Sequence, residues 1–216
     1  MILYTFGDSF TYGEELSDPQ TQAWPALVAK NINSELKNYS LPGCGNEYIV
    51  KRVMRKVAAI DNDQQQLFLI AWTSCGRLEF ADEFGAYDIW AGCRRRWKDP
   101  QPHREMLIKY ITAYNNVQHQ YRTWLRQCVL LQDFLKVRNI NYKFITAFDN
   151  HILNQQFLET AEPYNRLLDT SNFIGWPNTS LMELMGDCEK GPRGHPLIDG
   201  HKQIAKAITS SLQDYR

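Results

Sequence analysis

Short apolar runs alternate with helix-like stretches along this chain. The runs Met1–Phe6, Leu67–Trp72 and Tyr142–Phe148 consist almost entirely of apolar or β-branched residues, which is typical of strands buried on both faces. Two shorter segments, 37–41 and 172–176, are expected to be further strands. Strands of this kind, separated by helices, predict an α/β protein: a three-layer α/β/α sandwich around a mostly parallel sheet of five strands.

Apolar residues at intervals of three and four predict the helices. Segments 24–36, 49–60 and 198–212 have this spacing, and 181–186 is a shorter piece. From 104 to 138 the pattern is long, and it predicts either one helix or two with a bend. The chain shows no repeat and no linker, so we expect a single domain over residues 1–216, with an aromatic-rich insertion at about 76–103.

Composition excludes some classes of partner. Among 216 residues, 24 Lys and Arg balance 24 Asp and Glu, so no overall field favours nucleic acid or a membrane surface. Neither a secretory signal nor a membrane-spanning stretch is visible, which predicts a cytoplasmic protein. The five cysteines are scattered and the histidines lack ligand spacing, so we expect reduced thiols, no metal and no cofactor.

The first candidate for chemistry is the stretch GDSFTYG, residues 7–13, which follows the first strand. A buried strand that ends in a tight turn presents the hydroxyl of Ser9 at the carboxyl edge of the sheet. The first N–H groups of a following helix would point at the group that Ser9 attacks. Gly, Asp and Ser also form ordinary turns, so the alternative is a turn without chemistry.

Three other segments are expected at the same edge of the sheet. They are Pro42–Asn46, Thr73–Arg77 and the segment around His195. Parallel sheets bind ligands beyond the carboxyl ends of their strands, where these loops meet.

The order of these segments resembles the SGNH (GDSL-type) hydrolase superfamily over nearly the whole chain. GDSFTYG resembles the first block of that family, and HPLIDGHKQIAKAI, from His195 onward, resembles the last. The resemblance implies a flavodoxin-like fold, with Ser9 as nucleophile and His195 as general base. His201, in the last block, is expected to be a structural or a surface histidine. The middle of the chain also resembles SGNH-like proteins of large tailed phages.

The resemblance also implies an oxyanion hole. Its donors would be the N–H of Ser9 and a glycine after the second strand, either Gly43 or Gly45. The family usually carries an asparagine after the third strand, but Ser74 stands at that position here. The amide of Asn46 is a possible substitute.

The acid of the triad departs from the family pattern. It normally lies three residues before the histidine, where this chain has Pro192. Asp187 or Glu189 could reach the imidazole instead, or a backbone carbonyl could orient it. Asp8 and Arg77 are candidate substrate contacts, although Asp8 also suits a turn and Arg77 a salt bridge.

The implied function is hydrolysis of a small acyl ester, including O-acetyl groups on carbohydrate, through an acyl-enzyme on Ser9. A small-molecule or carbohydrate ester is therefore the expected partner, with no nucleic acid and no membrane, and the sequence does not give the oligomeric state. Two alternatives stay open: an SGNH-fold protein that binds a ligand or partner with weakened catalysis, and an acyltransferase that uses the same site.

Overall fold

The computed structural model describes all residues except 61–64, 83–84, 90–101, 114–115, 149–162 and 213–216. At its centre lie four parallel strands in the order β2 (Glu35–Asn38), β1 (Ile2–Phe6), β3 (Gln66–Trp72) and β6 (Asn141–Thr146). The chain passes from β1 outward to β2 and then returns to the other side of β1. The carboxyl ends of β1 and β3 therefore flank the switch point where open α/β sheets bind ligands.

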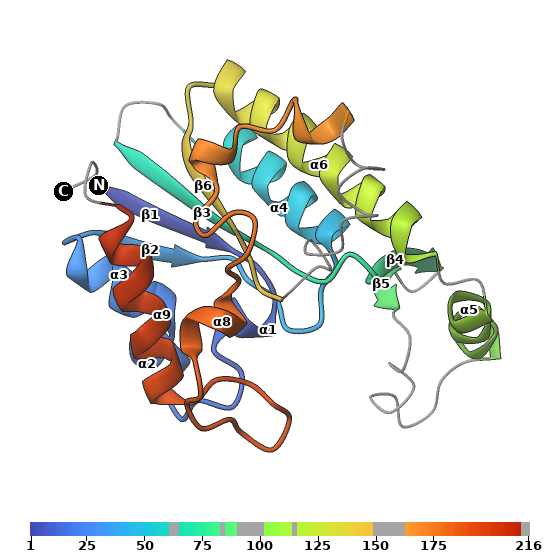
Figure 1. The fold of residues 1–216 in the computed structure, drawn as a ribbon, viewed down its shortest axis with the longest axis horizontal. Coiled ribbons are helices and arrows are strands. Elements are labelled where there is room, and N and C mark those ends of the chain that lie inside the picture. The colour runs from blue at the N-terminus through green and yellow to red at the C-terminus, as the bar shows by residue number, and fades with distance from the viewer. Residues whose placement is uncertain (61–64, 83–84, 90–101, 114–115, 149–162, 213–216) are drawn as a thin grey trace.

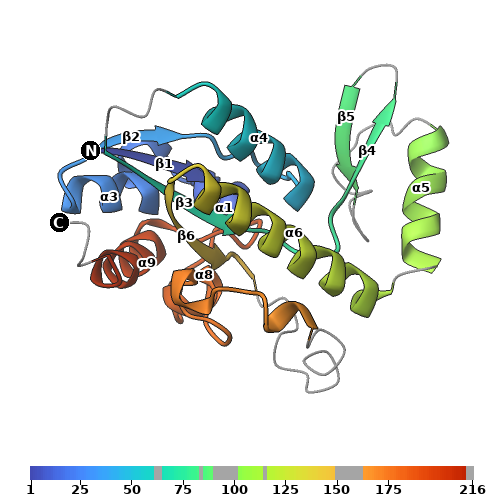
Figure 2. The same cartoon turned by 90° about the horizontal axis from the view of Figure 1, so that it is seen from above.

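Helices cover both faces of this sheet, as the sequence predicts (Figures 1 and 2). One face is covered by α3 (Trp24–Asn31) and α9 (Ile198–Ser210), together with the short α2 (Pro19–Gln22) and α8 (Leu181–Met185). The other face is covered by α4 (Asn46–Ala58) and α6 (Val117–Val137). The three-layer α/β/α sandwich is confirmed.

Alternation along the strands creates the two cores. Every residue of β3 is buried, and successive side chains point to opposite faces of the sheet. Leu67 and Leu69 join the core under α3 and α9. Phe68 and Ile70 join the core under α4 and α6. A strand that is covered on both sides has no polar face, which is why LFLIAW is an unbroken apolar run.

The sheet has four strands among the described residues, so the predicted count of five is wrong. The segment expected as the fifth strand makes one isolated parallel bridge, between Phe144 and Phe173. A short 3-10 turn, η2 (Thr170–Asn172), precedes Phe173, and the chain turns again when Asn178 N donates to Gly175 O. Only about two residues between these turns are extended, which is too short for a strand.

The expected insertion contains a separate two-stranded hairpin, β4 (Leu78–Asp82) and β5 (Gly85–Ile89). The segment from 104 to 138 belongs to two helices, of which α5 (Pro102–Ala113) packs on this hairpin through Ile108 and Ile111. Both views show the hairpin and α5 at one end of the molecule, away from the main sheet (Figures 1 and 2). Residues 90–101 of the insertion lie outside the described residues.

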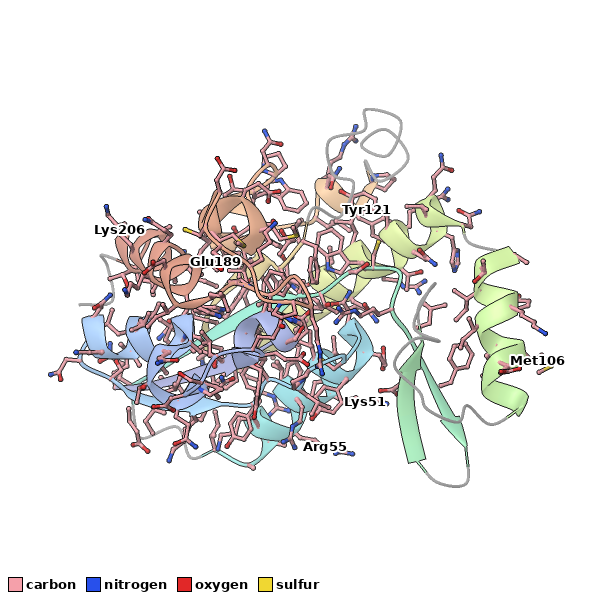
Figure 3. The ribbon with its side chains drawn as sticks, turned by 90° about the horizontal axis from the view of Figure 1, so that it is seen from below. Lys51, Arg55, Met106, Tyr121, Glu189 and Lys206 are labelled. Carbon is pink, nitrogen blue, oxygen red and sulfur yellow. The ribbon has the colours of Figure 1, made fainter. Side chains whose placement is uncertain are left out.

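An ion pair between Lys51 on α4 and Glu79 on β4 connects the hairpin to the helices that cover the main sheet (Figure 3). On α5, the side chain of Met106 is exposed (Figure 3). In the part of the chain that the structure describes, no helix is long and apolar enough to cross a membrane.

Candidate active site

Ser9 lies at the tip of the first strand. After β1 ends at Phe6, Asp8 caps the short helix α1 (Ser9–Tyr12) by accepting a hydrogen bond from Phe10 N at 3.0 Å. The turn closes at Gly13, whose φ of 89° favours glycine, and Gly13 N donates to Ser9 O. Ser9 is 3% exposed. The predicted nucleophile is therefore held at the switch point by its own turn.

Asp8 is fully buried and joins the strand-end loops. Its Oδ2 accepts hydrogen bonds from Thr73 Oγ1 at 2.7 Å and from Arg77 at 2.9 Å. Arg77 also donates to Cys44 O at 3.0 Å, so the ion pair connects the loops after β1, β2 and β3. Asp8 and Arg77, the two candidate substrate contacts, are therefore bonded to each other.

The side chain of Asn46 is bonded to the loop after β3. Its Oδ1 accepts from Thr73 N at 2.9 Å, and its Nδ2 donates to Thr73 O at 3.1 Å. Asn46 is also 3% exposed. In this arrangement the amide fixes the start of α4 to the loop after β3.

The other proposed oxyanion donors lie in the same loops. Gly43 has a φ of 80° in the turn closed by the bond from Cys44 N to Leu41 O, while Gly45 is the N-cap of α4. Ser74 is half-buried, and its Oγ accepts from Gly76 N at 3.3 Å. A hydroxyl that accepts one hydrogen bond still has its own hydrogen to donate.

His195 is brought to the nucleophile turn from the other end of the chain. Its ring centroid is 5.6 Å from that of Phe10, the residue after Ser9, and it is 7% exposed. Among the described residues, no hydrogen bond joins the Ser9 hydroxyl to the imidazole. Catalytic hydrogen bonds are often long or poorly aligned before substrate binds.

Two consecutive acids flank the imidazole. Nδ1 of His195 lies 2.7 Å from Oε2 of Glu15, and Nε2 lies 3.4 Å from Oε2 of Glu14. Arg193 in turn pairs with Glu14 at 2.6 Å. The acidic partners of the histidine therefore come from the N-terminal segment, about 180 positions away in the sequence.

The sequence did not identify Glu15. Asp187 and Glu189, the two acids expected near His195, are exposed, and within the described structure neither bonds to the imidazole. The sequence feature that could have pointed to Glu15 is Gly13-Glu14-Glu15, directly after the nucleophile turn. Gly13 has a left-handed conformation and changes the direction of the chain just before the two acids.

Burial raises the pKa of Glu15, but hydrogen bonds outweigh it. Both carboxylate oxygens accept from Arg193 N, at 2.9 and 3.1 Å, and Oε2 also accepts from His195 N at 3.2 Å. Together with the imidazole, these N–H groups lower the pKa of Glu15 below its ordinary value of 4.5. Glu15 is therefore a carboxylate at neutral pH.

His201, expected from the sequence to be a structural or a surface histidine, lies in the interior. It is fully buried, and its Nδ1 accepts from Trp24 N, at the start of α3, at 3.1 Å. Burial, together with the nearby His195, lowers the pKa of His201 to about 4, so it stays neutral near pH 7. It connects α9 to α3 behind the site.

A cavity of about 540 Å³ opens beside the loop after β3. It lies between α4, the hairpin, α5 and α6, and Arg77, the partner of Asp8, is part of its wall. Aromatic rings and amides also line it, among them Phe80, Tyr110, Trp124, Gln120 and Gln127. Of the described residues, no three His, Cys, Asp or Glu side chains are grouped to hold a metal ion.

Comparison with known proteins assigns most of the chain to a family. A family model described as a family of unknown function, DUF6071, matches residues 14–215. No curated protein sequence matches the chain.

Solved structures share the fold at low identity. TesA is 12% identical with a TM-score of 0.60, over 100% of both chains. The psychrotrophic esterase EstA from Pseudoalteromonas, inhibited by monoethylphosphonate, is 13% identical with a TM-score of 0.55, over 99% of this chain and 97% of that one. The acetyl xylan esterase Est2A from Butyrivibrio proteoclasticus is 17% identical with a TM-score of 0.53, over 99% of this chain and 63% of that one.

Proposed function

Because the chain belongs to DUF6071, a family of unknown function, and has the fold of the SGNH (GDSL-type) hydrolases, we propose that it is a serine esterase. Ser9 is the nucleophile and His195 is the general base. The observation that carries the proposal is that the structure brings His195 against the turn that holds Ser9, from a loop near the other end of the chain.

The reaction has two steps. His195 Nε2 takes the proton of the Ser9 hydroxyl as Oγ attacks the acyl carbon of the ester. The N–H groups of Ser9 and Gly43 and the hydroxyl of Ser74 stabilise the oxyanion. The alcohol then leaves with the proton from His195, and an acyl-enzyme remains. Water attacks this intermediate with the help of His195 and releases the acid.

In this mechanism Nε2 exchanges its contact with Glu14 for the Ser9 hydroxyl. The structure has Nε2 3.4 Å from Glu14 Oε2, a weak contact because good charge-assisted hydrogen bonds are shorter than about 3 Å. The bond at Nδ1 is short and holds the ring while Nε2 changes partner.

The proposed substrate is an O-acetylated carbohydrate or another small acyl ester. Aromatic rings and amides suit sugar rings and hydroxyls, and the cavity beside Arg77 is lined by both. Est2A, a protein of the same fold, is an acetyl xylan esterase.

Labelling with a fluorophosphonate tests the proposal. The Ser9 oxygen forms a bond to phosphorus, and fluoride leaves with the hydroxyl proton as HF, so the wild-type protein should gain the mass of the probe less HF at Ser9. Ser9→Ala should not react, whereas Ser17→Ala, which changes an exposed serine nearby, should react as the wild type does. Failure of the wild-type protein to react, or equal labelling of Ser9→Ala, would refute the esterase. Acetylated xylan and p-nitrophenyl esters then rank the substrates.

A further inference from the structure

The loop that carries His195 has no acid of its own in contact with the ring. Pro192 occupies the position three residues before the histidine. Asp187 and Glu189 are exposed and make no bond to the imidazole in the described part of the chain. Yet Nδ1 of His195 has a carboxylate 2.7 Å away, and that carboxylate belongs to Glu15.

We propose that Glu15 is the residue that positions His195, so that the triad is Ser9, His195 and Glu15. This inference rests on the proposed esterase function. It places the acid on the loop of the nucleophile, six residues after Ser9, in place of the loop of the histidine.

The bonding of Glu15 suits this role. Its carboxylate accepts hydrogen bonds from the backbone N–H groups of Arg193 and His195 as well as from the imidazole. The two backbone bonds fix the loop on either side of the ring, and the third fixes the ring within the loop. The Glu15 side chain is only 12% exposed, so water competes little for these donors.

The same bond selects the tautomer of His195. A carboxylate accepts hydrogen bonds and does not donate them, so the proton of the neutral imidazole is on Nδ1. The lone pair is then on Nε2, the nitrogen that must take the proton from Ser9. When His195 becomes an imidazolium during the reaction, the negative charge of Glu15 stabilises it without accepting the proton.

Gly191 provides the space for this carboxylate. A Cβ added at Gly191 would lie 2.7 Å from Cδ of Glu15, closer than such atoms approach in proteins. Gly191 also donates its N–H to His195 O at 2.9 Å, which closes the loop around the carboxylate. The histidine loop is therefore shaped to receive an acid from outside itself.

In the described part of the chain, the other charged or titratable groups near His195 include Glu14, at Nε2, Arg193, which pairs with Glu14, and the neutral His201, behind the site. Glu14 and Glu15 contact different nitrogens. The contact of Glu15 at Nδ1 is the shorter of the two, 2.7 Å against 3.4 Å, so Glu15 is the acid that sets the tautomer in this proposal.

Kinetics of three variants test the proposal. Glu15→Gln should lower kcat for a p-nitrophenyl ester by at least about 10²-fold, since a wrong tautomer has cost more than this in another triad. Glu15→Asp, which keeps the charge, should lose less, about tenfold. Asp187→Asn should stay within threefold of the wild type.

Two measurements separate a positioning role from a folding role. Formate added to folded Glu15→Ala should restore part of the activity, because it can occupy the space of the lost carboxylate. Nitrogen-15 NMR of labelled imidazoles should show His195 protonated at Nδ1 in the wild type and in mixed tautomers in Glu15→Gln.

The outcomes distinguish this proposal from the esterase itself. No reaction of the wild type with a fluorophosphonate refutes the esterase, and the NMR result still tests the tautomer. An active wild type whose Glu15→Gln variant keeps its rate within threefold would refute the role of Glu15. A loss in Asp187→Asn as large as in Glu15→Gln would assign the acid to Asp187 instead.

Discussion

Among single residues, Glu15 combines an uncommon backbone with a well-bonded side chain. Its φ is 73°, a left-handed conformation that costs a residue with a Cβ about 1 kcal/mol or more. The hydrogen bonds to Arg193 and His195 offset this cost. Backbone strain of this kind persists where the surroundings hold it, and functional sites are common places for it.

Gly191→Ala should disturb the site without removing a charged group. The added methyl would displace the Glu15 carboxylate, so we expect kcat to fall by about tenfold or more. Lys190→Ala, at the exposed neighbouring position, should have little effect. Steady-state kinetics measure this, and a Gly191→Ala variant with wild-type rates would contradict the close contact.

Among the structural elements, the loops at the carboxyl edge depend on Asp8. Its bonds to Thr73 and Arg77, and the further bond from Arg77 to Cys44, link the loops that follow three strands. These loops carry Ser9, Gly43 and Ser74. The relative positions of the proposed oxyanion donors therefore rest on one buried carboxylate and its ion pair.

Asp8→Asn should destabilise the protein by about 3 kcal/mol, because it removes the buried negative charge that pairs with the Arg77 guanidinium, whose side chain is 13% exposed. Asp18→Asn is the matched control. Asp18 also caps a short helix, and Asn preserves a cap in both variants, but Asp18 is exposed. Urea unfolding at pH 7 gives the difference, and a loss for Asp8→Asn below about 1 kcal/mol would contradict the structural role.

At the scale of the whole molecule, three groups of the described residues make the free energy of unfolding fall as the solution becomes acidic. His201 has its pKa lowered to about 4 from 6.5, so the unfolded chain binds the proton first and stability falls as pH drops from 6.5 toward 4. Glu15 and Asp169 have lowered pKa values, Asp169 about 2 because Lys136 and Ser171 bond to it. Their contribution to the free energy of unfolding is complete at pH values above their pKa in the unfolded chain. It is lost as the pH falls through their pKa in the folded protein.

His201→Asn should flatten the first part of this acid transition. The Asn oxygen can still accept the N–H of Trp24, but it does not titrate. We expect the wild type to lose about 3 kcal/mol of unfolding free energy between pH 6.5 and 4 from His201, and the variant to lose correspondingly less. The control is His119→Asn at an exposed position, which should behave like the wild type. Urea unfolding at a series of pH values measures the free energy of unfolding of each protein. The same dependence of this free energy on pH in the wild type and in His201→Asn would contradict the prediction.

The sequence by itself determined the layers and the two ends of the proposed site. Apolar runs such as 67–72 reveal buried strands because burial on both faces leaves no polar position. GDSFTYG and the His-Pro segment identify Ser9 and His195, because their local motifs are distinctive. The sequence overestimated the sheet by one strand, since one bridged residue between two turns is not distinguishable from a short strand by pattern.

Only the tertiary structure decided which acid meets His195 and what Asp8, Arg77 and Asn46 do. The contact between Glu15 and His195 joins positions 180 apart, and it depends on the path of two loops and on the space at Gly191. A shift of a few ångströms in the path of a loop changes which group a carboxylate can reach. Local patterns of residues do not encode that path. Side chains of a strand alternate between its two faces, so a strand leaves a repeating pattern in the sequence. The residues of a triad come together once, from distant positions, and leave no such pattern.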